Sequence, residues 1–151
     1  MSPLGDFFPA KQVEEFVLKR LTPGCVIRIE VTFPQVTKPK FLVLVDNGDP
    51  DFLTFIINSE THQFIENRPH LAKCQVDIDA TNHPFLDYDS KIACHETLVL
   101  KRADVLRELK RDTGKIKGNI SDDVRAEIVA AVKFAKTLSV EEKNVILASL
   151  S

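Results

Sequence analysis

The stretch FLVLVDNGDPDFLTFIIN, residues 41–58, predicts two long β-strands joined by a tight turn. Residues 41–45 are uniformly apolar, which is typical of a central strand that is buried on both faces. The turn DNGDP at 46–50 contains Asn47-Gly48, the dipeptide favoured in two-residue hairpin loops. Residues 52–58 read as the next strand. The stretch therefore predicts an antiparallel pair at the centre of a sheet.

Further short strands are expected on both sides of this pair. Residues 25–33, CVIRIEVTF, alternate apolar and polar side chains, which predicts a strand with one wet face. The alternation returns at 74–79, and short strands are expected at 91–94 and 97–101. Five or six short strands at close spacing are typical of a small β-barrel, and not of alternating strands and helices.

A helix is predicted at the N-terminal side of the first strand. Its apolar side chains recur at helical spacing over residues 11–21, and Pro23 with Gly24 ends it. The stripe expected to face the core consists of Val13, Phe16, Val17 and Leu21.

The last third of the chain is expected to be helical. One helix covers 102–111, a second follows the N-cap Ser121, and Ser139 with Glu142 forms a capping box for the third, at 139–150. The residues expected to be buried are Val105, Leu106 and Leu109; Val124, Ile128, Val132 and Ala135; and Val145, Ile146 and Leu150. Residues 59–73 lack a clean period and are expected to form a long loop.

The fold class predicted from these patterns is α+β. A small antiparallel β-barrel at about 22–101 is preceded by a helix and followed by a helical part at about 102–150. The 151 residues suit one domain, 1–151, which is long enough to bury a sizeable core. An open sheet with the helices on one face is the alternative.

The overall charge gives no general reason to expect nucleic acid or membrane as a partner. The net charge is −2 and the isoelectric point about 6.1. The charge is uneven, because residues 101–118 contain seven basic and three acidic residues. Such a segment can bind an anion, although a solvated helix face is the commoner meaning.

The cysteines and the hydropathy favour a cytoplasmic protein. Cys25, Cys74 and Cys94 are an odd number without close pairs, which argues against a disulfide framework and suits a reducing compartment. The first residues contain charges where a signal peptide needs an apolar stretch. No apolar run approaches the roughly 18 residues of a membrane helix, so no membrane partner is expected.

The chain has no phosphate-binding glycine loop and no CxxC, HExxH or GxSxG motif. Zinc would accept ligands such as His70, Cys74, Cys94 and His95, but their spacing matches no familiar site. Cysteines at strand edges more often pack as small apolar residues. No metal and no other cofactor is therefore expected.

A better case exists for cleavage of a phosphodiester. Cleavage of RNA through its 2′-hydroxyl needs a base, an acid and a cation for the charge that develops on phosphorus. Lys38 and Lys40 can supply the cation, and His62 is a candidate proton carrier. Asn58, Ser59 and Thr61 are candidate hydrogen-bonding groups. The segments 34–40 and 59–70 follow the first and third strands, so both can open at one end of a barrel, although solvated lysines in polar loops are common.

The polar connection at 80–90 contributes His83 and Asp89 as candidate substrate-binding groups. Asp87 and Asp89 can orient a histidine or repel a wrong substrate. The alternative, which the composition favours, is that these acids bond to their own backbone in turns, while Pro84-Phe85-Leu86 holds the connection to the core.

Four stretches together resemble the PemK/MazF-like toxins. Residues 21–47 are similar to the family's opening, in which a Pro-Gly-led strand runs into a loop and a basic residue before proline starts an apolar strand. FIINSET, 55–61, stands where the family has a strand that ends in a Thr/Ser pair. DSKIACHETLVLKRADV, 89–105, is similar to the later strands that lead into a helix, and GKIKGNISDDVRAEIVAAVK, 114–133, to the terminal turn and helix.

The resemblance covers about residues 22–136 and implies an SH3-like barrel, often dimeric. It implies metal-independent cleavage of single-stranded RNA, restrained by an antitoxin protein. By position, the family's catalytic arginine falls on Lys38, and its catalytic threonine or serine on Ser59 or Thr61. Lysine presents one point charge where arginine presents a planar fork, so the reaction is expected to be weakened or lost.

Two functions stay open from the sequence. The first is a toxin-like endoribonuclease in which Lys38, Thr61 and His62 are catalytic, and Lys40, Asn58, Ser59, His83 and Asp89 bind substrate. Its partners would be single-stranded RNA, an antitoxin and a second copy of the chain. The second is a non-catalytic SH3-like module that binds a protein partner from an operon or a phage-derived element.

Overall fold

The computed structural model describes residues 10–33, 36–46, 51–60 and 62–151. The turn containing Asn47-Gly48 and the candidate residue Thr61 lie outside the described residues. The helices are α1 (Ala10–Arg20), α2 (Gln63–Glu66), α3 (Pro69–Lys73), α4 (Arg102–Arg111), η2 (Thr113–Lys115), α5 (Asp122–Phe134) and α6 (Val140–Leu150). The strands are β1 (Cys25–Thr32), β2 (Thr37–Asp46), β3 (Asp51–Asn58), β4 (Gln75–Ile78), β5 (Ser90–Ala93), β6 (Leu98–Lys101) and β7 (Ile116–Asn119).

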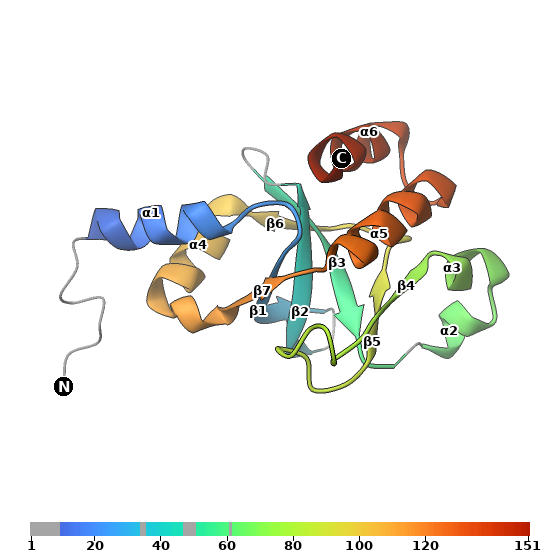
Figure 1. Cartoon of the computed structure of the whole chain (residues 1–151), viewed down its shortest axis with the longest axis horizontal. Coiled ribbons are helices and arrows are strands. Elements are labelled where there is room, and N and C mark those ends of the chain that lie inside the picture. The colour runs from blue at the N-terminus through green and yellow to red at the C-terminus, as the bar shows by residue number, and fades with distance from the viewer. Residues whose placement is uncertain (1–9, 34–35, 47–50, 61) are drawn as a thin grey trace.

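The strands form one antiparallel sheet in the order β4-β5-β3-β2-β1-β7, and β6 pairs with the other end of β3. The sheet curls into a half-barrel that is flanked by the N-terminal and C-terminal helices (Figure 1). This arrangement confirms the predicted α+β class and the small antiparallel barrel with helices at both ends. Among the described residues, the curl stays open, because β4 and β7 end the strand order and each pairs with one neighbour.

The centre of the sheet is buried on both faces, as the apolar run at 41–45 predicts. Val43 and Val45 belong to the core that α5 and α6 cover, whereas Leu42 and Leu44 belong to the core beneath α1 and α4. Successive side chains of a strand point to opposite faces, so a strand between two helical layers needs apolar residues throughout. Figure 1 shows α1 and α4 together at one end of the sheet and α5 and α6 along the sheet.

The helix boundaries follow their capping residues closely. Ser121 Oγ accepts from the Val124 N–H, and Ser139 with Glu142 forms the predicted capping box of α6. Gly24, just after α1, has φ +97°, a conformation that favours glycine. None of the helices within the described ranges is both long and apolar enough to cross a membrane.

Two residues of the expected buried stripes are exposed. Phe16 is 44% exposed, because α1 turns Val17 and Leu21 into the core and leaves Phe16 at the edge, beneath the Arg20 guanidinium. Val145 is 40% exposed beside the buried Ile146. Helical periodicity locates the apolar side of a helix but not how wide a stripe its neighbours cover.

The prediction of a loop at 34–40 is wrong for residues 37–40, which belong to a strand. Strand β2 starts at Thr37, so Lys38, Pro39 and Lys40 lie within it, opposite Val31, Glu30 and Ile29 of β1. Pro39 is tolerated there because the pairing of β2 with β3 begins only at Phe41. The side of β2 that faces β3 therefore needs no N–H at Pro39.

Two further differences concern short elements. The expected loop at 59–73 contains the helices α2 and α3, neither of which has a buried residue. Strand β7 was not expected, since its four residues, IKGN, include a glycine and have no clear alternation. It is formed by pairing with β1, which the local sequence does not encode.

Candidate functional site

One cavity of about 670 Å³ contains four of the residues that the sequence analysis proposes for RNA cleavage: Lys38, Lys40, Asn58 and His62. The two lysines lie two residues apart on β2 and so point to the same face of the sheet. Asn58 ends β3, and His62 precedes α2. We call this space the basic cavity.

Lys40 and Asn58 join β2 to β3 on the floor of the basic cavity. Nζ of Lys40 donates a hydrogen bond of 2.9 Å to Oδ1 of Asn58. The pKa of Lys40 is lowered from its usual 10.5, first by burial and then by the charge of Lys38. Lys38 itself is exposed, so the cavity holds one partly buried ammonium group and one exposed one.

His62 is held by the helix that it caps. Its Nδ1 accepts a hydrogen bond of 3.0 Å from the backbone N–H of Phe64. In the neutral ring the proton must then lie on Nε2. His62 therefore presents an N–H donor from the wall of the cavity.

A second histidine, His95, lines the same cavity and was not expected there. The amide nitrogen of Gln75 donates to Nδ1 of His95 at 3.0 Å and to the carbonyl of Leu71 at 3.0 Å. The Leu71 contact fixes the orientation of the amide, so neutral His95 also has its proton on Nε2. Burial lowers the pKa of His95, and the nearby Glu96 carboxylate opposes this effect.

Five other polar residues line the cavity: Glu60, Gln75, Lys91, Glu96 and Thr97. Lys91 pairs with Asn58 in the register of β3 and β5, and Gln75 pairs with Ala93 in the register of β4 and β5. The positions of Lys91 and Gln75 in the cavity depend on pairing between strands that are distant in the sequence. The local sequence therefore does not predict them. Glu60 lies between two residues that the sequence did single out. The apolar part of the wall comprises Phe33, Val36, Ile56, Ile65, Ala93 and Leu98.

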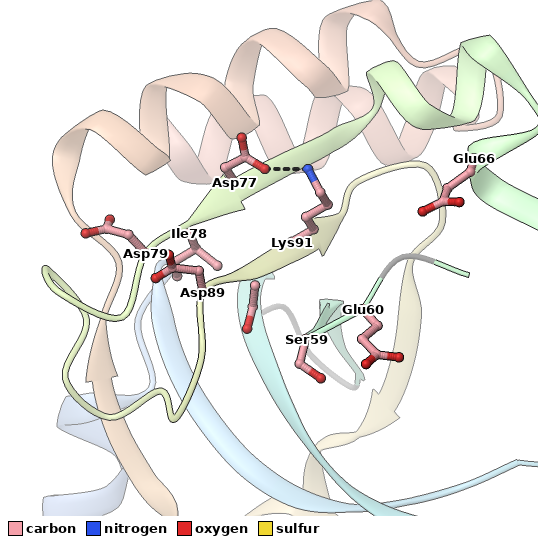
Figure 2. Close-up of a pocket in the computed structure, with 9 residues that line it drawn as sticks. Ser59, Glu60, Glu66, Asp77, Ile78, Asp79, Asp89 and Lys91 are labelled. Atoms are coloured by element: carbon pink, nitrogen blue, oxygen red, sulfur yellow. Dashed lines mark hydrogen bonds and ion pairs between the residues drawn. The ribbon is translucent and has the colours of Figure 1, made fainter. Parts of the chain in front are cut away.

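A second cavity of about 630 Å³ adjoins the first and shares Glu60 and Lys91 with it. It contains Ser59 and Asp89, so the structure places these two candidates apart from Lys38 and His62. Figure 2 shows the carboxylates of Asp77, Asp79 and Asp89 on one side of it, with Glu60 and Glu66 opposite. Five carboxylates and one lysine line this acidic cavity, which disfavours an anionic ligand there.

Asp89 also has a contact of the kind expected for a turn. Its Oδ1 accepts from the backbone N–H of Ala80 at 2.8 Å and so closes the 80–90 connection on itself. Leu86 is buried and anchors the same connection.

His83 does not reach either cavity. Its side chain is 1% exposed, its Nδ1 lies 2.9 Å from the carbonyl of Asp79, and its Nε2 accepts from the N–H of Ser121 at 3.0 Å. Both ring nitrogens therefore have protein partners, and the ring links the 80–90 connection to the start of α5. These contacts indicate a structural role for His83, which the sequence analysis assigned to substrate binding.

The cysteines and the hypothetical zinc ligands do not gather into a site. His70 Nε2 and Cys74 Sγ lie 3.9 Å apart, but the described part of the chain has no group of three His, Cys, Asp or Glu placed for a metal ion. All three cysteines are buried thiols. Burial raises the pKa of Cys25 to about 11 and also raises that of Cys74 and Cys94. These thiols are poor nucleophiles at neutral pH.

Comparisons with protein-family models and with curated proteins found no match to this chain.

Proposed function

We propose that the chain is a toxin-like endoribonuclease that cleaves single-stranded RNA without a metal ion. The observation that carries the proposal is the convergence of Lys38, Lys40, Asn58 and His62 in one cavity of about 670 Å³. A phosphodiester fits the two ammonium groups, and the apolar wall at Phe33 and Val36 gives a nucleobase a surface on which to stack.

The proposed reaction is attack by the 2′-oxygen of a ribose on the adjacent phosphorus. The new P–O2′ bond forms while the P–O5′ bond breaks, which leaves a 2′,3′-cyclic phosphate and a 5′-hydroxyl. Lys38 stabilises the charge that builds up on the phosphoryl oxygens. Glu60 takes the proton of the 2′-hydroxyl, and the Lys40 ammonium gives a proton to the leaving 5′-oxygen.

The lowered pKa of Lys40 supports this assignment, since its ammonium loses a proton more readily than that of an ordinary lysine. The other Nζ protons stay available while one is donated to Asn58. His62 acts as a hydrogen-bond donor to a phosphoryl oxygen through Nε2–H. Its Nδ1 already accepts from the Phe64 N–H. We therefore assign His62 the role of hydrogen-bond donor, instead of the proton carrier that the sequence suggested.

The test of this function is inducible expression in bacteria of the wild type beside the Lys38→Ala variant. Growth and the integrity of total RNA are followed together. Growth arrest with cleaved RNA in the wild type, and its loss in the variant, supports the proposal. Equal growth with intact RNA, at equal levels of folded protein, contradicts it.

A second function, a non-catalytic module that binds a protein partner, is favoured by one observation. The cavity combines lysines with the apolar side chains of Phe33, Val36 and Ile65, which suits a peptide segment that carries both acidic and apolar residues. In this case the basic cavity would bind an acidic segment of the partner. Recovery of a stoichiometric partner by pull-down from its native host, with no RNA cleavage, would decide for this function.

The remaining partners follow from the same proposal. An antitoxin protein would occupy the basic cavity and exclude RNA, and a homodimer would be the assembled form. The cytoplasm is the proposed location, supported by three cysteines that remain thiols.

A further inference from the structure

Lys91 lies on the boundary between the basic and the acidic cavity and lines both. It belongs to β5, the strand between β3 and β4. Asn58 of β3 pairs with it on one side and Asp77 of β4 on the other. Lys40, Asn58, Lys91 and Asp77 therefore form one row across four neighbouring strands.

In the structure, the Lys91 ammonium lies at the Asp77 end of this row. Its Nζ lies 2.6 Å from Oδ1 of Asp77, an ion pair that Figure 2 shows as a dashed line. Both side chains are exposed, at 45% for Lys91 and 81% for Asp77. An ion pair this exposed contributes little to stability, so an exchange of partner is not costly.

The other side of the row offers Lys91 a better position for an anion. Oδ1 of Asn58 is already engaged by Lys40, which leaves the Asn58 amide nitrogen to donate. Neighbouring strands lie about 5 Å apart, so Lys40, Asn58 and Lys91 present N–H donors within about 10 Å of one another. Beyond Lys91, the carboxylates of the acidic cavity would repel a phosphate.

We propose that Lys91 is a third phosphate-binding cation of the basic cavity and that Asp77 competes with the phosphate for it. The inference deepens the proposed function and rests on it for the class of ligand, a single-stranded RNA backbone. When phosphate binds, the Lys91 ammonium leaves Asp77 and turns over Asn58. The acidic cavity then marks the end of the phosphate track, because no cation follows Lys91 among the described residues that line it.

The test is the affinity for a 2′-O-methyl oligonucleotide, which has no 2′-hydroxyl and cannot be cleaved, measured at several salt concentrations. Lys91→Gln is expected to weaken binding and to reduce the slope of log affinity against log salt by about 0.7, the value for one phosphate contact on a single strand. Asp77→Asn is expected to strengthen binding about twofold to fivefold, the range that loss of a surface ion pair allows.

Two control variants each remove a charge of the same sign at a position outside the two cavities. Lys117→Gln changes an exposed lysine on β7, at the opposite end of the strand order. Asp104→Asn breaks the ion pair with Arg107 on α4, which also measures 2.6 Å. Each is expected to alter affinity less than its counterpart at the cavity. In the double variant Asp77→Asn/Lys91→Gln, the increase in affinity caused by Asp77→Asn should disappear, because the lysine that Asp77 holds is absent.

Inorganic pyrophosphate, as a second probe, separates this inference from the proposed function. If the wild type binds the oligonucleotide, but Lys91→Gln binds with the same affinity and salt slope, the inference is wrong and the proposed function stands. If the oligonucleotide does not bind while pyrophosphate binds in a Lys91-dependent manner, the RNA function is wrong and the cation assignment stands. If neither binds, both are wrong.

Discussion

Nζ of Lys40 and Oδ1 of Asn58 are joined by a hydrogen bond of 2.9 Å that connects β2 with β3 on the floor of the basic cavity. The contact holds a partly buried ammonium group next to an exposed one, that of Lys38. Burial and the second charge both lower the pKa of Lys40. A cation in this position can hold a phosphate and can also give up a proton, which separates it from an ordinary surface lysine.

The first prediction concerns the pH dependence of RNA cleavage. If the Lys40 ammonium is the proton donor, kcat/KM falls on the alkaline side as Lys40 loses its proton, at a pH below the usual lysine value of 10.5. The measurement is a pH–rate profile on a short single-stranded RNA.

Lys40→Arg is the matched control, since arginine keeps the charge and stays protonated throughout the range. The variant should be slower, and the alkaline fall should be absent or moved to higher pH. An unchanged alkaline limb in Lys40→Arg would show that another group donates the proton.

The second prediction concerns His83 and the stability of the fold. His83→Leu leaves the N–H of Ser121 and the carbonyl of Asp79 without their ring partner, in a place where His83 is 1% exposed. The free energy of unfolding should fall by about 2–3 kcal/mol, measured by urea denaturation. Affinity for single-stranded RNA should not change while the protein is folded. A loss of affinity without a loss of stability would return His83 to the binding site.

The third prediction concerns His95 and the dependence of stability on pH. Burial holds the pKa of His95 below its usual 6.5, so the unfolded chain takes up this proton at a higher pH than the folded one. The stability due to neutral His95 is therefore present above about pH 6.5 and is lost as the pH falls through the lowered value. His95→Asn should make the free energy of unfolding less dependent on pH.

The measurement compares urea denaturation of wild type and His95→Asn at several pH values between 5 and 8. This range lies above the usual values of the carboxyl groups whose pKa is lowered in the structure, those of Asp79, Glu108 and Glu142. Equal pH dependence in the two proteins would show that His95 is not held neutral by its surroundings.

The sequence predicts the floor of the basic cavity better than its walls. Lys38, Lys40 and Asn58 were expected together because the segments 34–40 and 59–70 follow the first and third strands, although the structure places both lysines within β2. Lys91 and His95 were not expected there. They reach the cavity through the pairing of β5 with β4 and with β3, and the paired residues of β3 and β5 are more than 30 positions apart.

Lys38 and Pro39 illustrate a different limit. The proline suggested a loop, since it removes an N–H that a central strand needs. Strand β2 is central at Phe41 but is paired on one side only at Pro39, so the same residue is acceptable two positions earlier. The sequence around Pro39 does not show at which residue the pairing of β2 with β3 begins.

The most direct test of the account is cleavage of a defined single-stranded RNA by purified protein in the presence of EDTA. Wild type is compared with Lys38→Ala and with Lys117→Gln, a lysine outside the cavity. The account predicts products with 2′,3′-cyclic phosphate and 5′-hydroxyl ends from wild type and Lys117→Gln, and a rate at least tenfold lower from Lys38→Ala, equivalent to about 1.4 kcal/mol of transition-state stabilisation. Intact RNA with folded wild type, or equal cleavage by Lys38→Ala, would contradict it.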